Sequence, residues 1–231
     1  MQRWKKFTNY DFAFNTQTAP IVIAELGRAV RSLPLAFTKD QETFRLSAIL
    51  GTKPNQNLYV DYQGRWLGGY VPAHFRSYPF YLENMELHFD EESGLISKTE
   101  GEPIFDRDGN YTKPVQDVFE FLKKIEQNRI ATQKAVDALA DKGLITEWKV
   151  KEIDGLYRAD EAKLSKLSDN DYLQLRKVQA MPVIYGQLFS MANIGVFDKL
   201  SNIREKTKPE DPGFTLSDDG DLDIDWDKIK I

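Results

Sequence analysis

The residues best suited to binding lie between Trp66 and Leu82, where aromatic rings, prolines, a histidine and an arginine share one short segment. The flat donor fork of Arg76 matches a carboxylate. With aromatic walls beside it, this group predicts a groove for a peptide or another extended ligand. The candidate binding residues are Trp66, Tyr70, His74, Arg76, Tyr78 and Phe80.

The same segment also fits a structural role, and its residue types favour that interpretation. Aromatic side chains fill core volume, prolines fix extended or turn geometry, and a buried arginine satisfies several carbonyls at once. A filled core around Arg76 would indicate a brace, whereas a deep cleft there would indicate a binding pocket. No residue of the segment is assigned a catalytic role.

An acidic turn offers the one spacing that resembles a metal loop. Asp106, Asp108 and Asn110 follow the i, i+2, i+4 pattern of calcium ligands, but Gly109 is not at the sixth position and Asp117 replaces the glutamate of the twelfth. An Asp-Gly turn needs these residue types without any metal. The chain has no cysteine and two histidines, so zinc lacks its preferred donors. We therefore predict no bound metal and no cofactor.

Catalytic and phosphate-binding motifs are missing from the sequence. It contains no G-x-S-x-G elbow, no H-E-x-x-H helix and no Walker or G-x-G-x-x-G loop. A net charge of −5 also gives no basic field for a polyphosphate, so we expect no nucleic-acid partner. Whether the protein catalyses a reaction stays open.

The amino terminus carries basic residues but no secretion signal. Arg3, Lys5 and Lys6 precede a polar stretch over residues 11–20, where a signal peptide needs an apolar run. No stretch of about 18 consecutive apolar residues occurs, so we expect no membrane span. We predict a cytoplasmic protein, which would reach the cell surface only by a signal-independent route.

The sequence pattern of the first half of the chain predicts short strands joined by tight turns. The patterns predict a helix from residue 21 to about 31, strands over 35–37 and 44–50, a hairpin of 58–62 with 65–67, and an alternating strand over 85–90. Residues 105–111 are typical of a turn. These elements must position the aromatic segment.

The second half has helical spacing. We expect one helix from Pro114 through residue 125 and another from 132 to Gly143, packed as a helical hairpin. A small β-hairpin should join 144–150 to 155–158, and Ser168 should cap a further helix. Pro182 then starts an apolar helix that runs through residue 191.

These elements predict an α+β fold, with mainly antiparallel strands first and helices with one small hairpin second. We place one domain at 1–206, strand-rich over 1–113 and helix-rich over 114–206, followed by an acidic tail at 207–231. In that tail Asp219, Asp221, Asp223 and Asp225 alternate with other residues, which favours a solvated strand face over a bound cation.

The aromatic segment resembles the core string of the SapC family of bacterial proteins. The matching residues are Tyr70, Pro72, Ala73, Arg76, Tyr78, Pro79 and Phe80, with further similarity at 57–61, 105–109 and 155–158. The likeness covers about residues 10–205, although Phe75 and Ser77 stand where the family often has a second arginine. The family name implies an association with a bacterial surface layer.

Two functions follow from this sequence. The first is a non-catalytic binding or assembly protein with a peptide or protein partner, for which the family name implies a surface-layer association. The second is an accessory protein or an enzyme in peptide or secondary-metabolite modification, using His74 and Arg76 beside an aromatic pocket.

Overall fold

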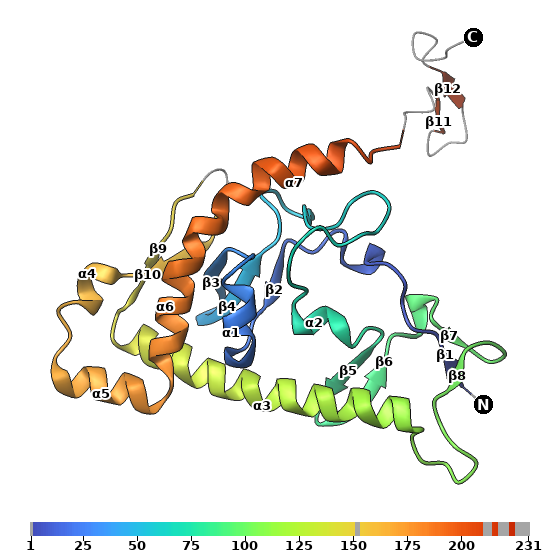
Figure 1. Cartoon of the computed structure of the whole chain (residues 1–231), viewed down its shortest axis with the longest axis horizontal. Coiled ribbons are helices and arrows are strands. Elements are labelled where there is room, and N and C mark those ends of the chain that lie inside the picture. Colours follow the sequence, from blue (N-terminus) through green and yellow to red (C-terminus); the bar gives the residue numbers. More distant parts are fainter. Residues whose placement is uncertain (1, 151–152, 210–213, 217–221, 225–231) are drawn as a thin grey trace.

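A computed structural model describes residues 2–150, 153–209, 214–216 and 222–224, the last two ranges by their backbone. Its main feature is a five-stranded antiparallel sheet in the order β2-β4-β3-β10-β9 (Figure 1). The strands are β2 (Thr18–Pro20), β3 (Leu35–Asp40), β4 (Thr43–Ile49), β9 (Ile145–Glu147) and β10 (Leu156–Ala159). The sheet therefore unites strands from both halves of the chain.

The β3–β4 hairpin forms the centre of this sheet. Leu35 pairs with Ala48 and Asp40 with Thr43, so the turn needs two residues, of which Gln41 adopts a positive φ of 53°. The first half of β3 is fully buried, as expected for a strand covered on both faces. The predicted strands at 35–37 and 44–50 are confirmed, and the hairpin predicted for 144–150 with 155–158 is confirmed as the β9–β10 pair at the edge of the same sheet.

The second half supplies the helices. They are α3 (Lys113–Asp141), α4 (Glu161–Leu164), α5 (Asp169–Lys177), α6 (Ala180–Ser190) and α7 (Val196–Glu205). Ser168 caps α5 as predicted, since its Oγ accepts a hydrogen bond from the Asp171 amide at 3.1 Å. The α+β prediction is confirmed.

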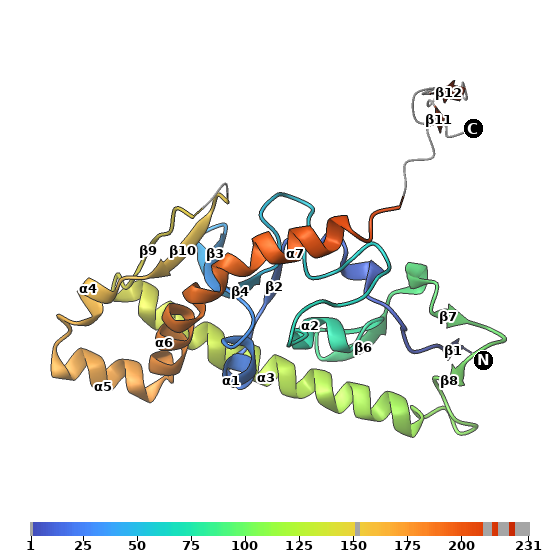
Figure 2. The same ribbon diagram turned by 45° about the horizontal axis from the view of Figure 1, so that its top comes forward.

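The helix α3 corrects one prediction, because it is a single helix of 29 residues rather than a helical hairpin. Residues 126–131 contain neither glycine nor proline, so nothing in the backbone ends the helix there. Its apolar side chains change neighbours instead: Val115 lies in one hydrophobic cluster and Leu139 in another. Figure 2 shows α3 running beneath both parts of the molecule.

The apolar helix α6 packs against the main sheet. Gln187 joins the two, since its Oε1 accepts from the Ala159 amide at 2.9 Å and its Nε2 donates to the Leu35 carbonyl at 3.1 Å. By length and composition alone, the helical stretch Ala180–Glu205 could also cross a membrane. In this fold its α6 portion contacts α1, α3, α5 and two strands.

The remaining elements are short, and several of them lie near the amino terminus. The strand β1 (Arg3–Trp4) lies between β7 (Ile96–Ser97) and β8 (Glu102–Pro103), and β5 (Phe80–Glu83) pairs with β6 (Glu86–Phe89). The short helical turns are η1 (Asp11–Ala13), η2 (Ile23–Glu25), α1 (Leu26–Ala29), α2 (Ala73–Arg76), η3 (Glu91–Ser93) and η4 (Met191–Gly195). Most of these small elements lie at the end of the molecule away from α5 (Figure 1).

Two hydrophobic cores result from this arrangement. The main core lies around the five-stranded sheet and includes the fully buried Phe37, Tyr59 and Leu139. The second core is built on four buried side chains, Trp4, Phe80, Ile104 and Val115. Because α3 contributes to both cores, it ties them together.

Two local predictions need correction, and a third falls mostly on residues that the structure does not describe. The hairpin expected at 58–67 is reduced to a single bridge between Val60 and Trp66, because Asp61 accepts backbone hydrogen bonds from within the turn. The strand predicted over 85–90 begins one residue later as β6, and Met85 is 51% exposed at the β5–β6 turn. In the tail, β11 (Phe214–Leu216) pairs with β12 (Leu222–Ile224), whereas Asp219, Asp221 and Asp225 lie outside the described residues.

Candidate functional site

The chain between Trp66 and Leu82 crosses from the main core to the second core. Trp66 stacks on Tyr59 with ring centroids 5.4 Å apart, and its Nε1 donates to the Tyr70 carbonyl at 3.0 Å. Phe75, on the single turn of α2, is buried in the main core. Phe80 is buried in the second core, where its ring meets Trp4 edge-on at 5.0 Å. The segment thus contributes buried aromatic side chains to both cores, which is the structural role that its composition favours.

A buried carboxylate fixes the position of α2. Glu25 is 4% exposed, and its Oε1 accepts from the Tyr70 hydroxyl at 2.9 Å and from the Ala73 amide at 2.6 Å. Its Oε2 accepts from the Val22 amide at 3.1 Å. Burial, together with the charge and hydrogen bond of Glu25, raises the pKa of Tyr70 to about 12 against the opposing charges of two arginines. Tyr70 is therefore a neutral donor at physiological pH.

Arg76 leaves the core and lies on the surface between aromatic rings. Its Cζ is 5.1 Å from the centroid of Phe121 and 5.8 Å from that of Tyr70. Its Nη2 donates a long hydrogen bond of 3.4 Å to the Tyr70 hydroxyl. Within the described part of the chain, no carboxylate forms an ion pair with Arg76. The guanidinium of Arg76 is therefore positioned by the rings of Tyr70 and Phe121, and no carboxylate neutralises its charge.

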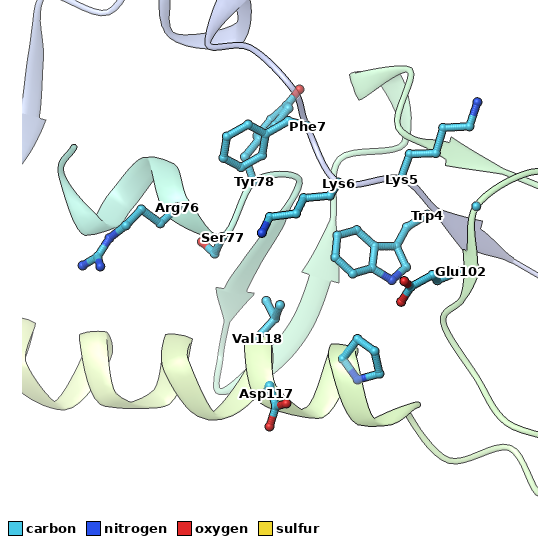
Figure 3. Close-up of a pocket in the computed structure, with 12 residues that line it drawn as sticks. Trp4, Lys5, Lys6, Phe7, Arg76, Ser77, Tyr78, Glu102, Asp117 and Val118 are labelled. Atoms are coloured by element: carbon cyan, nitrogen blue, oxygen red, sulfur yellow. The ribbon is translucent and has the colours of Figure 1, made fainter. Parts of the chain in front are cut away.

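A cavity of about 630 Å³ opens beside Arg76, and we call it the arm cavity because residues 4–7 of the amino-terminal arm form one wall (Figure 3). Figure 3 shows the side chain of Lys6 extending across it toward Ser77 and Val118. The other walls come from α2, β8 and the start of α3. The lining residues are Trp4, Lys5, Lys6, Phe7, Arg76, Ser77, Tyr78, Gly101, Glu102, Pro114, Asp117 and Val118.

The charges of the arm cavity are only partly paired. Lys5 pairs with Glu100, and Asp117 pairs with Lys113. Among the described residues, Lys6 and Glu102 have no ion-pair partner, as is also true of Arg76. Two unpaired cations and one unpaired carboxylate therefore line the cavity, which has a net positive charge in an acidic protein.

Two further hollows flank the same segment. One of about 220 Å³, here called the side hollow, lies between β5 and α3, and another of about 410 Å³ lies on the side of Phe12 and Asp90. His74 lines both of them. This histidine stays accessible to solvent overall, yet desolvation by the surrounding walls lowers its pKa, an effect that Glu25 partly opposes.

The six candidate binding residues therefore separate into two groups. Arg76 and Tyr78 line the arm cavity, and His74 and Phe80 line the neighbouring hollows. Trp66 and Tyr70 line none of these three spaces and act through packing and hydrogen bonds.

The sequence alone did not point to several residues of the site. They are Trp4, Lys6 and Phe7 on the arm, the buried Glu25, and Phe121 on α3. The run of aromatic and basic residues at positions 4–7 was the available signal, since such side chains together suit an anionic, partly apolar ligand.

The acidic turn at 105–111 is explained without a metal. Oδ1 of Asp106 accepts from the amides of Asp108 and Asn110, both at 2.9 Å, and Phe105 bridges to Tyr111. Within the described ranges, no group of three or more aspartate, glutamate or histidine side chains could hold an ion.

Comparison with known families gives a match over most of the chain. The SapC family model matches residues 1–196, which include the arm, α2 and all of α3. The chain belongs to the SapC family. No curated protein and no solved structure matches it. Every residue that lines the arm cavity lies within the SapC match, whereas nearly all of α7 and the acidic tail lie outside it.

Proposed function

We propose that this SapC-family protein is a non-catalytic binding protein that holds an acidic, extended ligand, such as a peptide segment of a protein partner, in the arm cavity. The observation that carries the proposal is the pair of cations, Lys6 and Arg76, that have no ion-pair partner among the described residues beside aromatic walls. A carboxylate placed there would gain a charge-assisted hydrogen bond.

The arrangement of Arg76 suits recognition. A guanidinium lying over Phe121 and Tyr70 is held by cation–π attraction, so little side-chain freedom is lost when a ligand arrives. Trp4, Phe7 and Tyr78 offer apolar surface for the rest of the ligand. Tyr78 is itself held by stacking on Phe12 at a centroid distance of 4.0 Å.

The polar groups of the arm cavity favour binding over acid–base catalysis. Its hydroxyls are Ser77 and Tyr78, and no histidine lines it. Tyr78 donates to Asp90 at 3.0 Å, and burial followed by that carboxylate raises the pKa of Tyr78. A phenol held in its protonated form is a poor general base. The family resemblance adds the bacterial surface layer as one setting for such a partner.

The test is a titration with two synthetic peptides that differ in one group. The first is acetyl-Ser-Phe-Glu-Ser-amide, and the second carries glutamine in place of glutamate. We expect the fluorescence of Trp4 to change on binding of the glutamate peptide, and Lys6→Gln and Arg76→Gln each to raise Kd about tenfold, which is about 1.4 kcal/mol. Trp4→Phe should remove the signal.

Lys134→Gln is the matched control, because Lys134 is exposed on α3 and does not line the cavity. It should leave Kd unchanged. Equal affinity for the two peptides, or equal effects of Lys134→Gln and Lys6→Gln, would contradict the proposal.

A further inference from the structure

Arg204, in the last turn of α7, is a buried cation without an acidic partner. The residue is 7% exposed, and within the described part of the chain no carboxylate forms an ion pair with it. Its Nε is buried and has no hydrogen-bond partner there. A charge that leaves water without a counter-charge or hydrogen bonds carries a large free-energy cost. An anion at the remaining donors of this guanidinium would lower that cost.

Two aromatic rings hold the guanidinium of Arg204 in place. Its Cζ is 4.0 Å from the centroid of Phe14 and 5.1 Å from that of Tyr62, and the centroids of the two rings are 5.4 Å apart. Cation–π attraction offsets part of the cost of burial, but the rings offer no acceptor for the N–H groups. Only Nε is both buried and unpartnered, so the terminal nitrogens Nη1 and Nη2 keep contact with solvent. These two nitrogens can donate together to one carboxylate.

The acidic residues of the loops that carry the two rings have other partners. Asp61, next to Tyr62, is fully buried and pairs with Arg65 at 2.7 Å. Asp11, shortly before Phe14, accepts a hydrogen bond from the side chain of Asn9 at 2.6 Å. A carboxylate for Arg204 must therefore come from another part of the chain or from a ligand.

The acidic tail is the part of the chain with an excess of carboxylates. Residues 207–231 carry eight acidic and three basic side chains, so the whole net charge of −5 lies there and residues 1–206 are neutral overall. The tail also starts beside Arg204. The Oγ1 of Thr207 accepts from the Tyr62 amide at 3.2 Å and donates to the Arg204 carbonyl at 2.8 Å. The point at which the chain leaves α7 is thus fixed next to the two rings (Figure 2).

The strength of one ion pair favours the tail over a free ligand. A hydrogen bond to a charged group contributes about 1.5–3 kcal/mol. From free solution that corresponds to a dissociation constant weaker than about 1 mM, so a free acid would leave the site mostly empty. A carboxylate on the same chain is held near the guanidinium by its tether, and its binding becomes intramolecular.

We infer that Arg204, held between Phe14 and Tyr62, binds a carboxylate of the protein's own acidic tail and so fastens the tail to the end of α7. None of these three residues lines the arm cavity, so the inference does not depend on the proposed function. It gives the acidic tail a defined attachment point on the folded domain.

The test follows the Nε–Hε group of Arg204 in proton–nitrogen NMR spectra of the full chain, where Arg204→Gln identifies its signal. All eight acidic residues of the tail are replaced by asparagine or glutamine. We expect the Arg204 signal to shift, because the guanidinium loses its paired carboxylate. The Nε–Hε signal of Arg129, which pairs with Glu126, is the internal control and should stay in place. An Arg204 signal that does not respond to the charge of the tail overturns the inference.

A spin label in the tail gives a second measurement. Because the chain has no cysteine, Ser217→Cys provides a single attachment site. We expect the label to broaden the amide signals of Phe14 and Tyr62, and both Arg204→Gln and the neutral tail to relieve most of that broadening. Lys199→Gln removes an exposed positive charge from the same helix and should leave the broadening unchanged.

The same label distinguishes the protein's own tail from that of a second copy. Spin-labelled chains without nitrogen isotope are mixed with isotope-labelled chains that lack the spin label. Broadening in this mixture would assign the carboxylate to a second copy and overturn the same-chain site, whereas sharp signals support it. The neutral tail decides the question even if Arg204→Gln fails to fold.

Discussion

The two cores of this protein are built differently, and the binding spaces lie beside the weaker one. The main core is covered by a five-stranded sheet and by α6, and its central strand β3 begins with three fully buried residues. The second core has four buried side chains, and β1, β7 and β8 in that region are two residues long each. A core with many buried side chains holds the surrounding strands and helices rigidly. A core with few buried side chains leaves space that a ligand can enter.

The contrast explains why the arm cavity persists without collapsing. Its walls come from elements that are individually short, but α3 carries them on a helix whose other end is anchored in the main core. Glu25 adds a second link by connecting α2 to the turn before α1. The cavity therefore has rigid support on two sides.

The largest effect is expected in the main core. Phe37→Ala removes a fully buried ring from the centre of the sheet, so we expect the free energy of unfolding to fall by about 5 kcal/mol, the upper end for such truncations. Urea unfolding followed by circular dichroism measures this loss. A much smaller loss would mean that the main core can repack and that the contrast between the cores is overstated.

The matched change in the second core is Phe80→Ala. Its ring is 2% exposed and contacts Trp4 and Phe89, so we expect a loss of about 3 kcal/mol. Hydrogen exchange should rise most in the small strands around residues 3–4 and 80–103 and least in β3 and β4. A loss under about 1 kcal/mol would mean that burial of Phe80 contributes little to the stability of the second core.

A smaller effect is expected at the link between the two regions. Glu25→Gln keeps the shape of the side chain but gives it an amide donor, which faces either the Val22 amide or the donors from Tyr70 and Ala73. We expect a loss of about 1–3 kcal/mol in urea unfolding, because a buried donor is left without an acceptor. Glu83→Gln, at an exposed site, is the control and should change stability by less than about 0.5 kcal/mol.

The next expected effect is a loss of stability that depends on pH. It concerns Asp61, whose carboxylate accepts hydrogen bonds within the turn before Trp66. Burial tends to raise the pKa of this carboxyl, but hydrogen bonds from Arg65 and from the Gln63 amide outweigh burial and lower it. Its folded pKa therefore lies below the unfolded value of about 3.9. The stabilisation is complete above that value and is lost as the pH falls through the folded pKa.

Asp61→Asn should accordingly cost about 1–3 kcal/mol at pH 7, and the difference from the unaltered protein should shrink as the pH falls below about 4. Urea unfolding at pH 7, 5, 4 and 3 measures it. Asp108→Asn, in an exposed turn, should show no such convergence. A cost that stays constant at every pH would show that the Asp61 charge contributes nothing.

Much of the fold could be read from local patterns. Alternation and turn residues placed β3, β4 and β6, and the serine at 168 placed the start of α5, because these signals act over a few neighbouring residues. The error at α3 has the opposite cause. Its apolar stripe serves two cores in turn, and no local signal distinguishes that from two separate helices.

The sequence by itself determined the composition of the site: an arginine among aromatic rings, no cysteine, two histidines and the SapC string around Arg76. Only the tertiary structure decided which of these groups face a cavity. Trp66 and Tyr70 pack and form hydrogen bonds inside the protein, while Lys6 and Arg76, which are far apart in the chain, both line the arm cavity. Side chains so far apart in sequence are brought together by long-range packing, which leaves no periodic trace in the sequence between them.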